Sequence, residues 1–127
     1  MKKQLKKELV YLASPYSKYP GGKSIAFTEV CDMAAHLMHK GYNVFCPIAH
    51  SHAIETMSFK EIENGDWWLE QDFAILSKCD KLFVYQMPSW DISYGVNAEI
   101  DFAKKNRIPI EYLAYDESFK RKATATG

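Results

Sequence analysis

Cysteine is scarce in this chain, and the cysteines that are present show no pairing pattern. Three occur among 127 residues, at Cys31, Cys46 and Cys79, and an odd count without paired spacing argues against a disulfide framework. Reduced thiols are typical of the cytoplasm, so we predict a cytoplasmic protein. Cys-x-x-Cys and His-Glu-x-x-His patterns are also absent, which leaves no sequence signature of a zinc site.

Long hydrophobic runs and an excess of one charge are absent as well. No stretch reaches the ~18 consecutive apolar residues that a membrane-spanning helix needs. The chain has 16 basic and 16 acidic side chains and a formal net charge of zero, whereas a general nucleic-acid binder needs a basic excess. We therefore expect neither a membrane nor a nucleic acid polymer as its partner.

The length and composition suit one globular domain. Apolar residues make up 47% of the chain and charged residues 25%, which is ordinary for a protein with a single core. Residues 1–8 resemble the charged start of a signal peptide but lack the apolar stretch that should follow, so we expect a solvated lead-in. The domain then spans residues 9–117, and the charged, then Thr/Ala-rich residues 118–127 are expected to form a flexible tail.

Turn-forming residues divide the domain into alternating apolar runs and helical patterns. The segment 48–64 is irregular and long for a connection, with room for a short helix. Asp66 is placed to act as the N-cap of the helix that follows. The alternation predicts an α/β fold, with a mostly parallel sheet of four to five strands and helices on both faces. We expect helices over 24–41, 66–76 and 98–105, and strands over 9–13, 42–46, 81–85 and 107–113.

Polar residues lie between the third expected strand and the last helix. Ser93 and Gly95 precede that helix, where a hydroxyl and free backbone N–H groups can hold an anion. Glu99 follows, and a carboxylate there could attack an anomeric carbon or stabilise a cationic centre. Asp91 could bind a sugar hydroxyl. Each residue also has an ordinary explanation: a turn, an N-cap, or a glutamate in a first helical turn that the helix dipole favours.

The end of the first expected strand should lie beside this junction. Right-handed crossovers bring the carboxyl ends of strands one and three to the same edge of the sheet. Tyr11 could then direct its hydroxyl at a carboxylate across the cleft, although a tyrosine buried in the core fits the sequence equally. The loop that follows, Ser14, Pro15, Tyr16 and Ser17, offers backbone N–H groups to the same anion.

An aspartate, a pair of tryptophans and a pair of histidines could serve the same cleft. Asp72 could act as a general acid if partial burial raises its pKa, but an exposed helical aspartate fits the sequence too. Trp67 and Trp68 are adjacent and must face different directions on a helix, so one of them could edge a pocket. His50 and His52 have no third ligand nearby in the sequence, so we expect no metal, and either a base contact or an exposed pair.

The stretch from Val10 to Tyr16 resembles the opening strand and loop of the nucleoside 2-deoxyribosyltransferase-like superfamily, which contains transferases and related nucleotide N-hydrolases. The similarity continues at 68–72, 81–85 and 90–99. It implies a flavodoxin-like, three-layer Rossmann-like sandwich, cleavage of an N-glycosidic bond without a cofactor, and a homodimer or higher homo-oligomer. It also implies that Glu99 is the nucleophile, that Tyr11 orients it, and that Asp72 helps to protonate the departing base.

The residue at position 93 distinguishes the transferases of that superfamily from its nucleotide hydrolases. The transferases tend to carry an aspartate there, which binds the free 5′-hydroxyl, whereas the nucleotide hydrolases carry a serine and, two residues later, a glycine for the 5′-phosphate. Ser93 and Gly95 match the hydrolases. An aspartate would repel a phosphate, whereas a serine at a helix N-terminus attracts it. A small shift of register would nevertheless give Asp91 the hydroxyl-binding role.

These residues together predict a nucleoside 5′-monophosphate N-glycosidase that hydrolyses the bond between the base and the (deoxy)ribose through Glu99. We expect Ser93, Gly95 and the loop from Ser14 to Ser17 to hold the phosphate. The base would stack on Tyr16, His50 or Trp67. Two alternatives remain open, namely a nucleoside 2-deoxyribosyltransferase and a non-catalytic protein that binds a nucleotide or an NAD derivative.

Overall fold

A four-stranded parallel sheet forms the middle layer of the protein. The structure is a computed structural model and describes residues 7–59 and 65–120. The strand order is β2-β1-β3-β4, and all three pairings are parallel, as predicted. The strands are β1 (Leu9–Ala13), β2 (Asn43–Phe45), β3 (Lys81–Gln86) and β4 (Ile110–Ala114).

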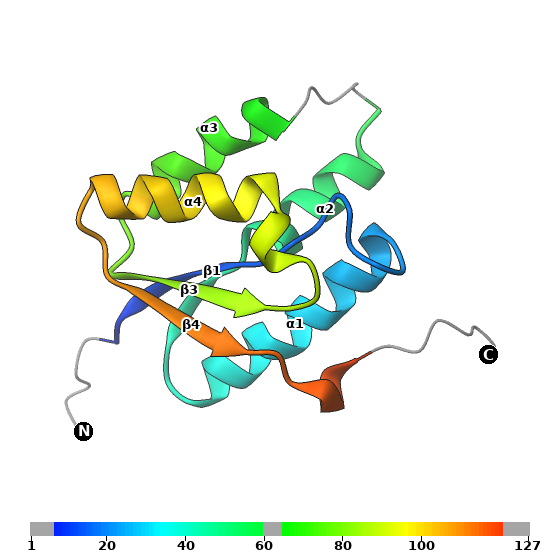
Figure 1. The fold of residues 1–127 in the computed structure, drawn as a ribbon, viewed down its shortest axis with the longest axis horizontal. Coiled ribbons are helices and arrows are strands. Elements are labelled where there is room, and N and C mark those ends of the chain that lie inside the picture. Colours follow the sequence, from blue (N-terminus) through cyan, green and yellow to red (C-terminus); the bar gives the residue numbers. More distant parts are fainter. Residues whose placement is uncertain (1–6, 60–64, 121–127) are drawn as a thin grey trace.

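Helices cover both faces of this sheet, which gives the predicted three-layer, flavodoxin-like α/β sandwich (Figure 1). Helix α1 packs on one face, and α3 and α4 pack on the other. The helices are α1 (Lys23–His39), α2 (Pro47–Met57), α3 (Gly65–Leu76) and α4 (Tyr94–Lys105), with short 3-10 turns at η1 (Trp90–Ile92) and η2 (Glu117–Phe119). In the part of the chain that the structure describes, none of these helices has the length and apolar character needed to span a membrane.

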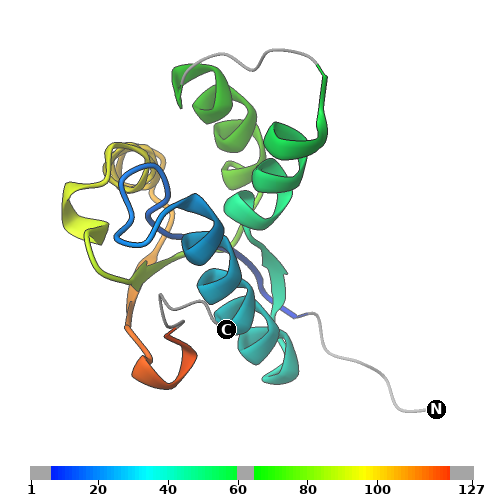
Figure 2. The same cartoon turned by 90° about the vertical axis from the view of Figure 1, so that its right-hand side faces the viewer.

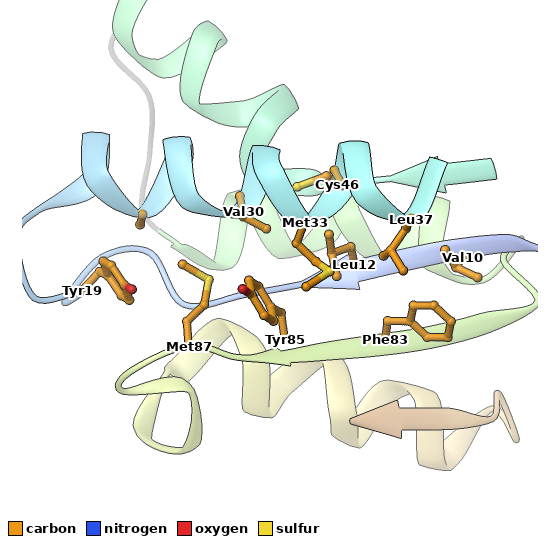
Figure 3. Close-up of a cluster of buried hydrophobic side chains, with 12 residues drawn as sticks. Val10, Leu12, Tyr19, Val30, Met33, Leu37, Cys46, Phe83, Tyr85 and Met87 are labelled. Carbon is orange, nitrogen blue, oxygen red and sulfur yellow. The ribbon is translucent and has the colours of Figure 1, made fainter. Parts of the chain in front are cut away.

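Alternation along β1 and β3 divides the core into two clusters. Val10 and Leu12 point toward α1 together with Phe83 and Tyr85 (Figure 3), whereas Tyr11 points to the opposite face. Side chains on successive strand residues point to opposite faces. Strand β1 therefore contributes buried side chains to both core clusters. This alternation places the Tyr11 hydroxyl on the α4 side of the sheet.

The α1 face contains a buried carboxyl group. Glu29 is 1% exposed, and its Oε1 accepts hydrogen bonds from the hydroxyls of Tyr19, at 2.6 Å, and Tyr115, at 2.7 Å. Tyr19 lies in the β1–α1 loop and Tyr115 follows β4. Glu29 therefore links the C-terminal segment to the β1–α1 loop. Phe119 packs against the same cluster, and residues 121–127 of the expected tail lie outside the described residues.

Several element boundaries differ from the sequence-based expectation. Helix α4 begins at Tyr94 because Ser93, rather than a later residue, caps it. Strand β4 begins at Ile110 rather than at Arg107. Arg107 adopts a positive φ of 60°, and the Ile108 N–H bonds back to the Ala103 carbonyl at 2.9 Å, so these residues close the helix.

The irregular segment after β2 begins with a helix. Pro47 occupies the first turn of α2, where a missing N–H costs nothing because the first N–H groups of a helix have no partner within it. Asp66 lies inside the first turn of α3 rather than at its N-cap, and its Oδ1 accepts a hydrogen bond from the Tyr94 hydroxyl at 2.8 Å. This bond links the starts of α3 and α4. Residues 60–64 lie outside the described part of the chain.

Candidate active site

A cavity of about 590 Å³ opens at the carboxyl ends of β1 and β3. Ligands bind at this edge in open α/β sheets. The β1–α1 loop lies between the first turns of α1 and α4 (Figure 2), and α2 and α3 supply the remaining walls. The structure thus brings together the two segments that right-handed crossovers were expected to place side by side.

Glu99 lies on α4 and lines this cavity. Its neighbours Val96, Ile100 and Ala103 anchor α4 in the core, which leaves Glu99 only 4% exposed. The Tyr11 hydroxyl donates a hydrogen bond to Glu99 Oε2 from beneath the cavity. Burial raises the pKa of Glu99 above its ordinary value, the hydrogen bond from Tyr11 opposes that shift, and the charge of Asp72 adds to it.

Asp72 lies on α3 and lines the same cavity. It is 8% exposed, and Leu69 and Leu76 on the same helix are also buried. Burial raises the pKa of Asp72 to about 6. Because two carboxyl groups share one cavity, their protons are lost in two steps that belong to the pair, and near neutral pH the pair retains about one proton.

The N-terminus of α4 lines one part of the cavity through Ser93, Tyr94 and Gly95. Ser93 is the N-cap, and its Oγ accepts a hydrogen bond from the Val96 N–H at 3.2 Å. Asn97 Nδ2 donates to the backbone carbonyls of Asp91 and Ser93 at 3.0 and 2.9 Å, which fixes the turn before the helix. A Cβ added to Gly95 would meet no described atom within 4 Å, so the space beside this residue is open to a ligand.

The β1–α1 loop lines the opposite wall through Ser14, Pro15, Tyr16 and Ser17, all of which the sequence predicted. The Tyr16 hydroxyl lies 2.6 Å from His52 Nδ1, and His52 stacks on Phe27 with ring centroids 4.3 Å apart. These contacts hold the Tyr16 ring in place, and burial raises the pKa of its hydroxyl to about 12.

Four predicted site residues do not line the cavity. Tyr11 is fully buried and reaches the site only through its hydrogen bond to Glu99. Asp91 is exposed on η1, and His50 is exposed on α2, where its ring packs against Phe45 with centroids 5.8 Å apart. Trp67 is 36% exposed, and its neighbour Trp68 lines the cavity instead. The rotation of α3 decides this, because Trp68 lies four residues before Asp72 and therefore shares its face of the helix.

The sequence interpretation missed several lining residues. Lys18 and Lys23 border the cavity, and Lys23 Nζ forms an ion pair with Glu55 Oε2 at 2.7 Å. Two lysines beside a predicted phosphate loop were a usable signal, whereas Glu55 lies in the irregular segment 48–64, for which the sequence indicated only room for a short helix. Two lining side chains have buried polar atoms without a hydrogen-bond partner among the described residues, namely Ser14 Oγ and Trp68 Nε1.

Residues 7–59 and 65–120 contain no group of three or more His, Cys, Asp or Glu side chains that could hold a metal ion. The cavity has two carboxyl groups with raised pKa values, and they lie next to the N-terminus of α4, where the helix dipole favours a negative charge. One carboxyl group can act as a nucleophile while the other donates a proton.

Comparison with curated proteins found no significant match to this chain. A family model described as "Domain of unknown function (DUF1937)" matches residues 8–114, which include both carboxyl groups and every segment that borders the cavity. The chain therefore belongs to the DUF1937 family.

Proposed function

We propose that this protein is a nucleoside 5′-monophosphate N-glycosidase, which hydrolyses the bond between the base and the (deoxy)ribose. One observation carries the proposal: Glu99 and Asp72, from different helices and both with raised pKa values, line one cavity with the capped N-terminus of α4. The resemblance of the motifs to the nucleoside 2-deoxyribosyltransferase-like superfamily supports the same reaction.

In the first step, a Glu99 oxygen forms a bond to the anomeric carbon C1′ of the sugar. The C1′–N bond breaks and its electron pair leaves with the base, while Asp72 transfers its proton to the base. Tyr11 donates a hydrogen bond to Oε2, one of the two carboxylate oxygens of Glu99. This bond favours the ionised form of Glu99. The required state has one proton on the pair, held by Asp72. Because burial raises the pKa of Glu99 to about 8 and that of Asp72 to about 6, this is the minor singly protonated form of the free protein, and the proton must pass to Asp72 before the attack.

In the second step, water replaces the carboxylate on C1′. Asp72, now ionised, accepts a proton from the water, whose oxygen bonds to C1′, and the electron pair of the ester bond returns to Glu99. The products are the free base and a (deoxy)ribose 5-phosphate, and both carboxyl groups regain their starting protonation. No other reactant takes part.

The charge distribution around the cavity favours a phosphorylated substrate. Ser93 and Gly95 present a hydroxyl and backbone N–H groups at the positive end of the α4 dipole, and Lys18 and Lys23 border the same cavity. A phosphate dianion would compete with Glu55 for the Lys23 ammonium group, because charge-assisted bonds from a lysine form equally well with phosphate or carboxylate.

The position of Asp91 favours hydrolysis of nucleotides over transfer between nucleosides. A transferase of the resembling superfamily needs a carboxylate for the free 5′-hydroxyl, and Asp91, the one aspartate near that position, is exposed and outside the lining of the cavity.

The homo-oligomer that the resemblance implies belongs to this proposal too. Light scattering of the purified protein would measure its mass.

The experiment is a screen for released base. The protein is incubated with ribo- and 2′-deoxyribonucleoside 5′-monophosphates of the common bases, with matching nucleosides as controls, and products are separated by chromatography. We expect base release from at least one nucleotide, faster than from its nucleoside, and none from the Glu99→Gln variant. Addition of a second free base should produce no exchanged nucleoside.

Three results would contradict the proposal. Folded protein that releases no base from any nucleotide is not this enzyme, and a ligand recovered intact after tight binding would instead indicate a binding protein. Equal activity in Glu99→Gln would remove the assigned nucleophile. Exchange of bases on unphosphorylated nucleosides would identify a transferase.

A further inference from the structure

We propose that the indole N–H of Trp68 is a second hydrogen-bond donor to the base, beside Asp72, so that the site selects bases with two neighbouring acceptors on one edge. Guanine and hypoxanthine have such an edge at N7 and O6, and adenine does not. This inference rests on the proposed function, because it assigns the substrate class of the same cavity.

The first observation is the environment of the indole nitrogen. Trp68 Nε1 is buried and has no hydrogen-bond partner in the described part of the chain, yet the side chain lines the cavity. Buried polar groups in native proteins are nearly always paired, and the exceptions need a cause. Nε1 itself is closed to solvent, so after a small rotation of the indole ring a ligand atom in the cavity would provide the missing partner.

The chemistry of indole restricts that partner. The indole nitrogen donates a hydrogen bond and accepts none, so the ligand atom that faces it must be an acceptor. Ser14 Oγ is the other buried polar atom in this cavity without a described partner. A hydroxyl both donates and accepts, so Ser14 does not discriminate between ligand atoms, and Trp68 does.

The second observation is the spacing on α3. Trp68 and Asp72 are four residues apart, so their side chains lie one above the other on the same face of the helix, and both line the cavity. Asp72 in its neutral form also presents a donor. The helix therefore presents two donors, one turn apart, to whatever base occupies this wall.

Purine bases differ at the edge that would meet these donors. Guanine presents two acceptors, N7 and O6, whereas adenine presents the N7 acceptor and the N6 amino donor. An amino group against the indole N–H would leave two donors unpaired, and sites built for a hydrogen bond discriminate strongly against an analogue that cannot form it. We expect a preference for guanine over adenine of about tenfold to 100-fold in affinity.

The test measures binding in the Glu99→Gln variant, so that turnover does not interfere. The variant is labelled with ¹⁵N and titrated with GMP, AMP, 2-aminopurine riboside 5′-monophosphate and ribose 5-phosphate, and with the 2′-deoxy forms. The chain has three tryptophans, and substitution of each by Phe assigns its indole N–H resonance. We expect the Trp68 resonance to shift with GMP and to stay in place with ribose 5-phosphate.

Affinities measured by calorimetry complete the design. Trp68→Phe keeps an aromatic ring and removes the N–H, so it should weaken GMP binding about tenfold and leave the nucleotide of 2-aminopurine, which lacks O6, within twofold. Trp67→Phe is the matched control. The Trp67 ring meets Trp68 edge to face, with centroids 5.0 Å apart, and phenylalanine keeps an aromatic ring there, so neither affinity should change.

The possible outcomes are distinct. If GMP binds while the Trp68 resonance stays unmoved, or if Trp68→Phe weakens every nucleotide equally, the assignment of the indole is wrong and the N-glycosidase proposal stands. If no nucleotide binds to the folded protein, both are wrong. The spectra of the Trp68-containing protein decide the matter even if Trp68→Phe fails to fold.

Discussion

Glu99 experiences opposing influences on its pKa from the groups around it. Burial and the charge of Asp72 favour the neutral carboxyl group, and the hydrogen bond from Tyr11 favours the carboxylate. The proposed nucleophile must be ionised to attack. At the scale of single residues, Tyr11 is therefore a positioning residue whose hydroxyl also determines the pH range in which Glu99 can act.

Replacing Tyr11 with Phe should move the acid limb of the pH–activity profile upward. Loss of a hydrogen bond to a charged group costs ~1.5–3 kcal/mol, which corresponds to about one to two pH units. Activity at pH 7 should fall and should partly return at higher pH, where Glu99 ionises. Profiles of kcat/KM measure this shift. Tyr85→Phe is the control, because the Tyr85 hydroxyl lies on the other face of the sheet and accepts from the Asp116 N–H; an unmoved limb in Tyr11→Phe would contradict the assignment.

Replacing Asp72 with Asn should reduce turnover according to how much the base needs a proton to leave. General acid catalysis contributes ~10²–10⁴-fold, so we expect a loss of that size for an ordinary nucleotide. A 7-methylguanine base is already positive and leaves without protonation, so its release in the first turnover, before the water attack that also uses Asp72, should change little. Single-turnover release of base from both substrates tests this, with exposed Glu70→Gln as the control on the same helix. Equal losses on both substrates would show that Asp72 is not the acid.

Adjacent tryptophans illustrate what the sequence could establish about single residues. It indicated that Trp67 and Trp68 face different directions, but the rotation of α3 about its axis depends on how the helix packs on the sheet, which no local pattern contains. The same holds for His50, which α2 turns away from the cavity. Residues at strand ends, such as Tyr11 and Ser14, were predictable because the topology of the sheet places them.

At the scale of one element, the N-terminus of α4 contributes both to the stability of the helix and to the proposed phosphate site. Ser93 accepts the Val96 N–H, and replacing an N-cap serine by alanine costs ~1 kcal/mol. Aspartate is an equally good cap, so Ser93→Asp should keep the unfolding transition near that of the parent protein. Its charge should raise KM for nucleotides at least tenfold by repulsion and leave KM for nucleosides unchanged. Equal KM values for nucleotides in both proteins would place the phosphate elsewhere.

The C-terminus of α4 predicts a stabilising substitution. Arg107 has φ 60°, a conformation that costs a residue with a Cβ ~1–2 kcal/mol and that glycine adopts freely. Part of the gain is offset by the greater freedom of glycine in the unfolded chain. Arg107→Gly should therefore raise the free energy of unfolding by about 0.5–1 kcal/mol in urea titrations.

Asn106→Gly is the matched control for that substitution. Asn106 has φ −103° and its Nδ2 donates to the Phe102 carbonyl at 2.8 Å, so glycine there should lower stability. A gain at both positions would contradict the explanation from backbone conformation.

Helices and strands could be predicted where the residues that specify them are neighbours in the sequence. Strands β1 and β3 are continuous apolar runs buried on both faces, and they were found nearly at their true limits. Strand β2 has only three residues and is partly buried, and the apolar pattern of α2 is weak because Pro47 and Ser51 are its buried residues. The end of α4 at Lys105 was predicted correctly. The start of β4 was placed too early, at Arg107, because an arginine gives no sign of a positive φ, unlike a glycine.

At the scale of the whole molecule, the buried carboxyl groups should make stability depend on pH. Burial raises the pKa of Asp72 from 3.8 to about 6 and raises that of Glu99 as well. The folded state then holds protons that the unfolded state has lost, so stability is highest below their unfolded pKa values and falls as pH rises through the folded values.

The measurement is the free energy of unfolding between pH 4.5 and 8.5, from chemical denaturation. We expect a decline that begins at the lower end of this range and levels off near pH 8, where Glu99 has ionised in the folded parent protein. The profile should be flatter in Glu99→Gln, which removes one of the two ionising groups but retains the shape of its side chain. A parallel decline in both proteins would mean that Glu99 is not the source.

The hydrogen bond between Tyr11 and Glu99 joins residues separated by 88 positions, and Asp72 enters from a third region of the chain. These three groups come from distant parts of the chain. Strands β1 and β3 must pair before the Tyr11 hydroxyl can reach the Glu99 carboxylate. After dilution from denaturant, regained turnover would consequently time the completion of the sheet. Helices that form early from local contacts would not restore turnover. The recovery of turnover would therefore report the last long-range step of refolding.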